Sequence, residues 1–165
     1  MHRLILLCVM LAACAAPAPT PRTVFRNAGG PIYSSAAFDM AQLEGRWLQA
    51  AAFSAGDTPG CAPGGAEFSR TGAGLQVTGR LCLSGKQVAF NGPVAPTGPG
   101  RFTVPGMGEW WVVWVDVDYR TLAIGTPSGA WGFVLDEATI SGDRLRAATE
   151  IFDFNGYPAP RLKAF

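Results

Sequence analysis

Short apolar runs separated by glycine- and proline-rich turns fill the chain from residue 45 to residue 135. Runs of this length, each bounded by turn residues, predict β-strands rather than helices. Eight such sequence-adjacent strands can close into an antiparallel up-and-down barrel with room for one small ligand. An open β-sandwich is the alternative that the spacing leaves open. The expected strands are 45–53, 66–70, 75–82, 86–91, 101–104, 109–116, 119–124 and 130–135.

The periodicity changes after the last expected strand. Leu145, Ala148 and Phe152 recur at helical spacing, with charged residues between them. This pattern predicts a short amphipathic helix over 143–154 whose apolar stripe packs on the core. Residues 157–165 should follow as a short extended tail.

The first 13 residues have the pattern of a targeting segment. A short polar start precedes an apolar run that is too short to span a bilayer. Leu11-Ala12-Ala13-Cys14 resembles the lipobox of bacterial lipoproteins, in which the cysteine sulfur receives a diacylglycerol. The resemblance implies a signal peptide over 1–13, a lipidated Cys14 and, from Ala15 after the cysteine, a place in the outer membrane. A secretory leader with an incidental Cys14 is the alternative.

Residues 14–37 are rich in proline and small side chains and have little apolar surface. We expect them to form a semi-stiff tether after the lipidated cysteine. The remaining residues, 38–165, show no internal repeat and have the length of one domain.

The composition argues against several functions. Formal net charge is +1, from 13 basic and 12 acidic residues, so no basic footprint for nucleic acid is present. The only histidine, His2, lies in the expected leader, which leaves no imidazole for a nucleophile system, a general base or a zinc site. No phosphate loop or dinucleotide fingerprint occurs. We therefore expect no catalytic residues, no metal and no cofactor.

Asp116 and Asp118 form the one close carboxylate pair within a motif. Positions two apart on a strand share a face, so the pair could hold a turn or lie solvated at a strand end. We interpret it as structural, with acid/base catalysis as the alternative.

Cys61 and Cys82 flank an expected hairpin whose turn is Thr71-Gly72-Ala73-Gly74. A turn centred between Thr71 and Gly72 pairs Arg70 with Ala73 and places Cys61 opposite Cys82, within reach of a disulfide. In an exported protein we expect that bridge, worth on the order of 3 kcal/mol. A redox pair is the alternative, but the spacing is not Cys-x-x-Cys and no nearby basic group would activate a thiolate.

Gly45-Arg46-Trp47 at the first strand is matched by motifs far downstream. These are Trp111-Val112-Val113, Asp116-Val117-Asp118-Tyr119, Gly125-Thr126-Pro127-Ser128-Gly129 and Trp131-Gly132-Phe133-Val134-Leu135. With Phe38-Asp39 and Leu43-Glu44 they resemble lipocalins of the bacterial outer-membrane type over about residues 38–162. The resemblance implies an all-β, eight-stranded antiparallel up-and-down lipocalin barrel with one C-terminal α-helix packed outside.

The resemblance also implies which side chains face inward. Gly45 and Trp47 would form the base of the barrel, with Trp47 closing its floor, while Trp110 and Trp114 face outward. An aromatic core filled by its own side chains is what composition alone favours, whereas the resemblance favours a hydrophobic pocket. The residues expected to contact a ligand are Gln49, Ala51, Phe53, Trp111, Val113, Trp131 and Phe133. Val115 and Leu135 should also face the interior.

One departure from the family concerns the floor. Many lipocalins carry an arginine stacked on the tryptophan, and Glu137 stands at that position here. The base should therefore close differently, for instance with another basic residue over Trp47.

These observations predict a lipid-anchored lipocalin that faces the periplasm and binds or transports a fatty acid or lysophospholipid. Its expected partners are that hydrophobic ligand and the membrane that holds the anchor. A structural or envelope-interaction lipoprotein with a filled barrel is the main alternative, and an enzyme on the same barrel is a third. A filled interior would favour the structural role, whereas an enclosed pocket lined by Trp111 and Phe133 would favour transport.

Overall fold

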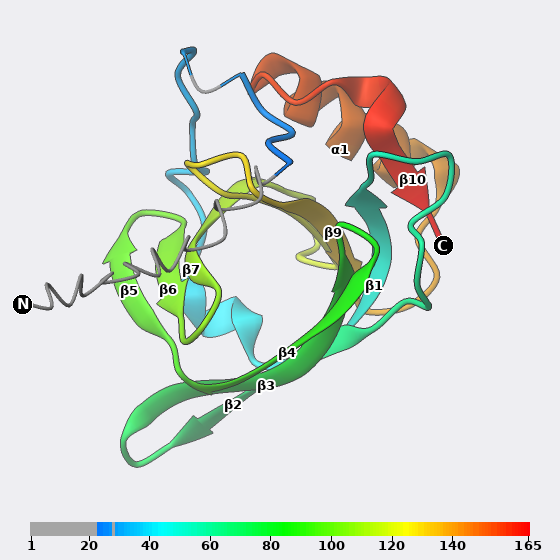
Figure 1. Cartoon of the computed structure of the whole chain (residues 1–165). Helices are drawn as coiled ribbons and strands as arrows, with labels where there is room; N and C mark the ends of the chain where they lie inside the picture. The colour runs from blue at the N-terminus through cyan, green and yellow to red at the C-terminus, as the bar shows by residue number, and fades with distance from the viewer. Residues whose placement is uncertain (1–22, 28) are drawn as a thin grey trace, which may run out of the picture.

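A computed structural model describes residues 23–27 and 29–165; the expected signal peptide and Cys14 lie outside these residues. The strands follow one another around a ring, and one helix, α1 (Gly142–Phe154), lies outside it (Figure 1). Neighbouring strands pair antiparallel in the order β4-β3-β2-β1-β9-β8-β7-β6-β5. Their bounds are β1 Gly45–Phe53, β2 Gly65–Thr71, β3 Gly74–Leu83, β4 Lys86–Pro93, β5 Ala95–Gly98, β6 Arg101–Val104, β7 Gly108–Val115, β8 Thr121–Gly125 and β9 Gly132–Asp136.

The expected count of eight strands is wrong, because nine follow the ring. The additional strand, β5, is separated from β4 by a single residue, the buried Val94. β4 pairs with β3 while β5 pairs with β6, so this bent stretch joins the two ends of the sheet. The result is a nearly closed barrel and not an open sandwich. A short strand, β10 (Leu162–Ala164), pairs with the far end of β1 and forms part of the expected tail.

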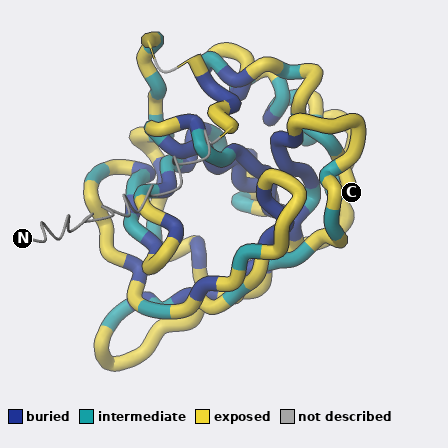
Figure 2. Tube along the Cα trace, viewed as in Figure 1, coloured by how far each residue is buried: buried dark blue, intermediate teal, exposed yellow. Residues whose placement is uncertain are grey.

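The sheet separates two apolar clusters. Many segments of the ring of strands are buried (Figure 2). We call the first the lumen cluster, because strands from around the whole ring contribute to it, as do the residues just before β1. The second, the helix cluster, lies between α1 and the outer face of the sheet. The lumen cluster includes Leu43, Trp47, Phe68, Val77, Phe90, Phe102, Trp110, Val112, Ile124, Phe133 and Leu135. The helix cluster includes Phe25, Ala51, Phe53, Val113, Ala123, Val134, Ala148, Phe152 and Tyr157.

Two β-bulges change which residues face the lumen. In β1 the register shifts between Gln49 and Ala51, so Ala52 joins the lumen cluster while Ala51 and Phe53 join the helix cluster. The inward orientation expected for Ala51 and Phe53 is therefore wrong. A bulge inserts one residue and reverses the facing of everything after it. The second bulge lies in β7, between Val112 and Trp114.

The expected facing of the β7 tryptophans is reversed at the start of that strand. Trp110 lies in the lumen cluster, whereas Trp111 and Val113 pack in the helix cluster, against expectation. After the bulge, Trp114 faces the helix cluster and Val115 the lumen cluster, as predicted. Assigning one parity to the whole strand fails because the bulge lies in its middle. In β9, which is regular, Phe133 and Leu135 face the lumen cluster as expected, and so does Trp131 just before it.

The β2–β3 hairpin has a different register from the one expected. Arg70 pairs with Leu75, and Thr71 pairs with Gly74, so the turn is two residues long. The disulfide between Cys61 and Cys82 is nonetheless present, with 5.7 Å between the Cα atoms. Cys61 precedes β2 and so is not held by the hairpin register. The predicted bridge is confirmed, while the register argument for it is wrong.

The folded unit begins before the expected domain boundary at Phe38. Phe25 is buried in the helix cluster, and the buried Arg26 donates to the carbonyls of Asn155 and Pro127. Ser35 donates its backbone N–H to the Val112 carbonyl at 2.7 Å. The described part of the expected tether is therefore a strap on the barrel. The missed signal is Phe25, an aromatic residue between proline-rich and glycine-rich stretches.

The C-terminal helix forms where its periodicity predicts. The Ser141 hydroxyl accepts from the Arg144 N–H and caps the N-terminus, and Ala148 and Phe152 face the sheet. Arg144 reaches back to the buried Asp136 at 3.2 Å, which joins the helix to the end of β9. Within the described residues, no helix is long and apolar enough to cross a membrane.

Candidate functional site

One end of the barrel is closed by the segment that leads into β1. The 3-10 helix η1 (Met40–Leu43) lies across the far end of the ring in Figure 1. The Trp47 indole is buried and donates to the Leu43 carbonyl at 2.9 Å, which holds this segment against the floor. Tyr119 supports it from the β7–β8 turn, since its hydroxyl donates to the Ala37 carbonyl and its ring packs on Phe38. Trp47 thus lies at the base, as expected.

The expected basic residue over Trp47 is not found among the described residues. Among the described residues, the one arginine that stacks on an indole is Arg101, 3.9 Å from the ring of Trp111 on the outer face. The partner of Trp47 is instead the backbone of η1. Asp136, the residue before Glu137, has a different role. Its buried carboxylate accepts from the Thr121 hydroxyl at 2.6 Å and forms an ion pair with Arg144.

The Asp116 carboxylate holds the β7–β8 turn. It accepts the backbone N–H groups of Arg120 and Thr121, both at 2.6 Å. Arg120 also pairs with Asp118 at the surface. These contacts support the structural interpretation of Asp116, because hydrogen bonds of the turn itself occupy its buried carboxylate.

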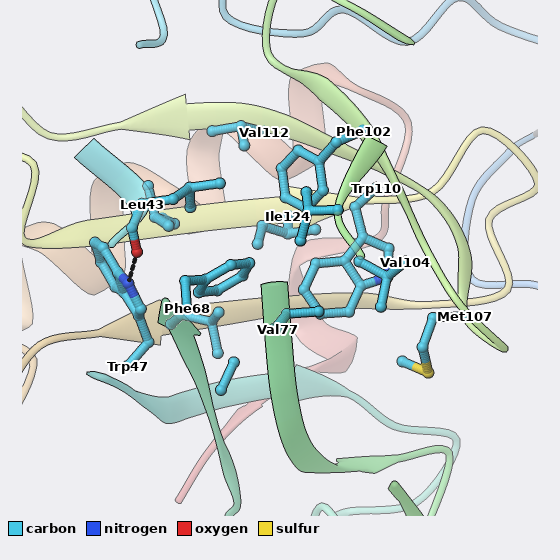
Figure 3. Packing of buried hydrophobic residues seen from close by; sticks show 14 of the residues in the cluster. Leu43, Trp47, Phe68, Val77, Phe102, Val104, Met107, Trp110, Val112 and Ile124 are labelled. Carbon is cyan, nitrogen blue, oxygen red and sulfur yellow. Dashed lines mark hydrogen bonds between the residues drawn. The ribbon is translucent and has the colours of Figure 1, made fainter. Parts of the chain in front are cut away.

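The middle of the lumen is filled by aromatic rings. Trp110 lies at the centre, with ring centroids 5.8 Å from Phe102, 5.5 Å from Phe90 and 4.9 Å from Phe133. Phe68 from β2 reaches Phe102 from β6 at 6.3 Å, so side chains meet across the barrel (Figure 3). Such edge-to-face contacts pack a core well. The lumen is therefore not hollow along its whole length.

A pocket of about 800 Å³ opens beyond these rings, at the end opposite the Trp47 floor. We call it the mouth pocket. The turns β3–β4, β6–β7 and β8–β9 surround it, and Thr23 of the N-terminal segment also lines it. Its apolar lining comes from Leu83, Val88, Met107 and Trp131, all of which belong to or pack against the lumen cluster. Its size lies in the range of small-molecule sites.

The rim of the mouth pocket is polar. Lys86 and Glu109 line it from β4 and β7; Lys86 is exposed, and Glu109 is half-buried. The Glu109 carboxylate accepts from the Thr97 hydroxyl at 2.6 Å, whereas Lys86 forms no ion pair among the described residues. Thr23, Ser84, Thr126 and Ser128 also line the pocket, so polar and apolar side chains share its surface. A site with both kinds of side chain can orient an amphiphile.

The β8–β9 wall of the mouth pocket is fastened from outside the barrel. The Tyr157 hydroxyl accepts from the Thr126 N–H at 2.8 Å, and its proton lies near the carbonyls of Thr126 and Trp131. Burial raises the pKa of this phenol. The tyrosine side chain fits against Gly125 and Gly132, where an added Cβ atom would come within 3.1 Å of its hydroxyl oxygen and 2.9 Å of its ring, respectively. The wall is therefore set by residues that never touch the pocket.

The structure brings together few of the residues expected to contact a ligand. Trp131 lines the mouth pocket, and Phe133 lies below it in the lumen cluster. Gln49 is buried with its amide group bonded to the backbone of Cys82 and Gly64, which joins β1 to β3 beyond the end of β2. Ala51, Phe53, Trp111 and Val113 face the helix cluster on the other side of the sheet.

Sequence reasoning missed the residues that form the pocket. Leu83 and Val88 flank the β3–β4 turn, and Met107 lies in the β6–β7 turn between two glycines. Met107 was the available signal, because turns exposed to solvent usually carry polar residues, glycine or proline. No group of three or more histidine, cysteine, aspartate or glutamate side chains is placed to hold a metal in the part of the chain that the structure describes.

No protein-family model matches the chain, and no curated protein matches it. Among solved structures it is similar to the major allergen Per a 4 from cockroaches and to lobster apocrustacyanin A1. The first is 15% identical with a TM-score of 0.56, over 81% of this chain and 92% of that chain. The second is 13% identical with a TM-score of 0.55, over 88% and 92%. Both are lipocalin-like, and at these identities the likeness shows the fold alone.

Proposed function

We propose that this protein binds a small hydrophobic molecule in its mouth pocket. The observation that carries the proposal is the pocket itself, about 800 Å³ in volume, in which Leu83, Met107 and Trp131 supply apolar surface and polar side chains supply the rest, above a packed lumen. Burial of apolar ligand surface would drive binding, at about 25 cal/mol for each Å² removed from water. The lipocalin-like fold supports this proposal, because barrels of this kind hold ligands at the open end of the strands.

The rim points to an amphiphile with an acidic headgroup, such as a fatty acid or a lysophospholipid. Lys86 lies at the edge of the pocket, where an ammonium group can pair with a carboxylate or phosphate. The apolar chain would then lie over Leu83, Met107 and Trp131. We propose a carrier or binding protein and no catalytic role.

We propose further that a lipid on Cys14 anchors the protein to the outer membrane, facing the periplasm. Thr23, the first described residue, lines the mouth pocket, and nine peptide steps separate it from Cys14. A chain of that length spans at most about 30 Å. The mouth would therefore stay close to the lipid surface that supplies or receives the ligand. Replacing Cys14 with Ser should release the protein from membranes, and a variant that stays bound would refute the anchor.

The ligand proposal is tested by titrating the purified protein with a dansyl-labelled undecanoic acid and competing the label off with palmitate or lysophosphatidylcholine. Val88→Trp should fill the pocket and weaken binding at least tenfold. Thr78→Trp adds the same indole on the outer face of the barrel and should bind like the parent. Lys86→Ala should weaken palmitate binding severalfold. Absence of binding by the parent protein, together with no lipid in native mass spectra of protein from its own envelope, would refute the proposal.

A structural envelope lipoprotein is the second candidate, and the filled middle of the lumen favours it. Phe68, Phe102 and Trp110 meet across the barrel and occupy the space in which a deep ligand would lie. The two roles differ in what the mouth pocket does. If Val88→Trp leaves the envelope phenotype of the protein intact while abolishing every ligand interaction, the structural role holds.

A further inference from the structure

Two neighbouring tryptophans each have a buried indole N–H with no hydrogen-bond partner among the described residues. They are Trp110 and Trp111, consecutive on β7. Since successive residues of a strand face opposite sides of the sheet, one indole belongs to the lumen cluster and the other to the helix cluster. A buried donor without an acceptor is costly, so each needs a physical account.

The Trp111 indole is enclosed by the protein. Its ring is covered by the Arg101 guanidinium at 3.9 Å, and Arg101 is itself held by the Ser34 hydroxyl at 2.8 Å. Arg101 and Trp111 are cross-strand partners in the β6–β7 register, so the stacking is fixed by the sheet. The residues that cover Trp111 come from the strap and the sheet, and none of them lines the mouth pocket.

The Trp110 indole lies directly below the mouth pocket. Gly108 and Glu109, the two residues before it on β7, line the pocket. In Figure 3 the nitrogen of Trp110 lies on the side of the ring that faces Val104 and Met107. Met107 lines the pocket and belongs to the same lumen cluster as Trp110, which makes its side chain the one best placed to cover the unpaired N–H on the pocket side.

The cover over Trp110 is able to move. Methionine has three rotatable bonds and adapts its shape readily. Met107 lies between Gly106 and Gly108, both at positive φ, and a Cβ atom added at either glycine would meet no atom within 4 Å. The turn is thus uncrowded on both sides of the methionine, and its side chain can turn into the mouth pocket without displacing backbone.

We propose that the Trp110 indole N–H is a specificity determinant of the mouth pocket, which selects hydrophobic ligands carrying a hydrogen-bond acceptor at their buried end. This inference rests on the proposed binding function. The ligand displaces Met107 and places a carbonyl or ether oxygen against the N–H. A purely hydrocarbon end leaves the donor unpaired, so the site discriminates between two molecules of the same shape. Lys86 at the rim and Trp110 at the inner end then contact opposite ends of one ligand, so an acidic amphiphile that carries a keto or ether oxygen near its far end binds more tightly than a plain fatty acid of the same length.

The test uses two isosteric probes, 2-acetylnaphthalene and 2-ethylnaphthalene, which differ by one carbonyl in place of a methylene. The parent protein should bind the ketone about fivefold more tightly, the effect of one neutral hydrogen bond. Trp110→Phe removes the donor and keeps an aromatic ring, and it should bring the two affinities within twofold of each other. Trp111→Phe removes an equally unpaired indole from the other face, and it should keep the fivefold preference.

A second measurement does not depend on the folding of a variant. With ¹⁵N-labelled indoles, the five tryptophans give separate N–H signals, and the Trp110 signal should move downfield with the ketone and not with the hydrocarbon. Binding of both probes with equal affinity, or a ketone-dependent shift in a signal other than that of Trp110, would overturn this inference and leave the binding function standing. If neither probe nor the dansyl-labelled fatty acid binds, the binding function itself fails.

Discussion

The lumen cluster and the helix cluster contain the same kinds of side chains but differ in how they end. The helix cluster is enclosed on every side that the structure describes, by the sheet, by α1 and by the strap that carries Phe25. The lumen cluster is closed at one end by Trp47 and Leu43 and opens at the other into the mouth pocket. The two clusters therefore differ in role. The helix cluster stabilises the fold, and the open end of the lumen cluster is available to bind a ligand.

The largest effect should come from the enclosed cluster. Phe152 is fully buried, packs edge-on against Phe53 at 5.0 Å and contacts Tyr157 at 5.2 Å. Phe152→Ala should lower the free energy of unfolding by about 3–5 kcal/mol, because the cavity it leaves cannot be filled by solvent. Chemical denaturation followed by circular dichroism measures the loss.

The matched change at the open end is Met107→Ala. The space that it leaves joins the mouth pocket, so the cost should be only about 1 kcal/mol, below that of a methionine in a sealed core. If both variants lose the same stability, the division between the two clusters is wrong.

The disulfide should give the next largest effect, on the wall of the mouth pocket that faces away from α1. Cys82 precedes Leu83 on β3, and Cys61 is 21 residues away in the chain. Replacing both cysteines with Ala should cost about 3 kcal/mol through loop closure in the unfolded state. Urea titrations of the double variant and of the reduced parent should agree. A larger loss in the variant would mean that the β3–β4 wall also depends on the packing of the two sulfurs.

Tyr157 links the two regions, because its ring belongs to the helix cluster while its hydroxyl holds the β8–β9 wall of the pocket. Tyr157→Phe should cost about 2 kcal/mol, since the Thr126 N–H loses its buried acceptor. The raised pKa adds a pH dependence. The folded state prefers the neutral phenol, so this stabilisation is complete below the unfolded pKa of about 10 and is lost as pH rises through the higher folded pKa.

Unfolding curves of the parent and the Phe variant between pH 8 and pH 11 separate the two contributions. The difference between the proteins should be constant up to about pH 10 and shrink above it. A difference that grows with pH would show that the phenolate is favoured in the folded state, contrary to its burial.

The lumen cluster and the helix cluster also differ in how much of their structure could be predicted from the sequence. Eight of the nine strands around the ring and the helix expected over 143–154 followed from local patterns, because each depends on residues close in sequence. The floor at Trp47 followed from the resemblance, and the disulfide was predicted correctly from a hairpin register that was wrong. The side of the sheet that each side chain faces could not be predicted in the same way. The bulges in β1 and β7 have no signature in composition, and each breaks the alternation along its strand. Ala51, after the bulge in β1, and Val113, at the bulge in β7, were misassigned because a single alternation was applied along each strand.

The mouth pocket was beyond sequence reasoning for a different reason. Three turns form it, and their positions along the barrel axis depend on the tilt of strands that are far apart in the chain. The strand that brings the β6–β7 turn to this height, β5, contains Pro96 between Ala95 and Thr97, a composition that predicts a turn. Pairing with β6 overrides that preference.

The smallest change in stability is expected for Arg101, whose guanidinium covers the indole of Trp111. Arg101 stacks on Trp111 and is held by Ser34, so Arg101→Lys keeps the charge but loses the planar contact. The expected loss is about 0.5–1 kcal/mol, the value of a partly exposed cation–π contact. Ligand affinity in the mouth pocket should not change, because Arg101 lies on the other face of the sheet from Trp110. Parallel denaturation and probe titrations test this pair of outcomes. A change in the preference between the two naphthalene probes would show that the faces are coupled through β7, and the clusters would then form one unit and not two.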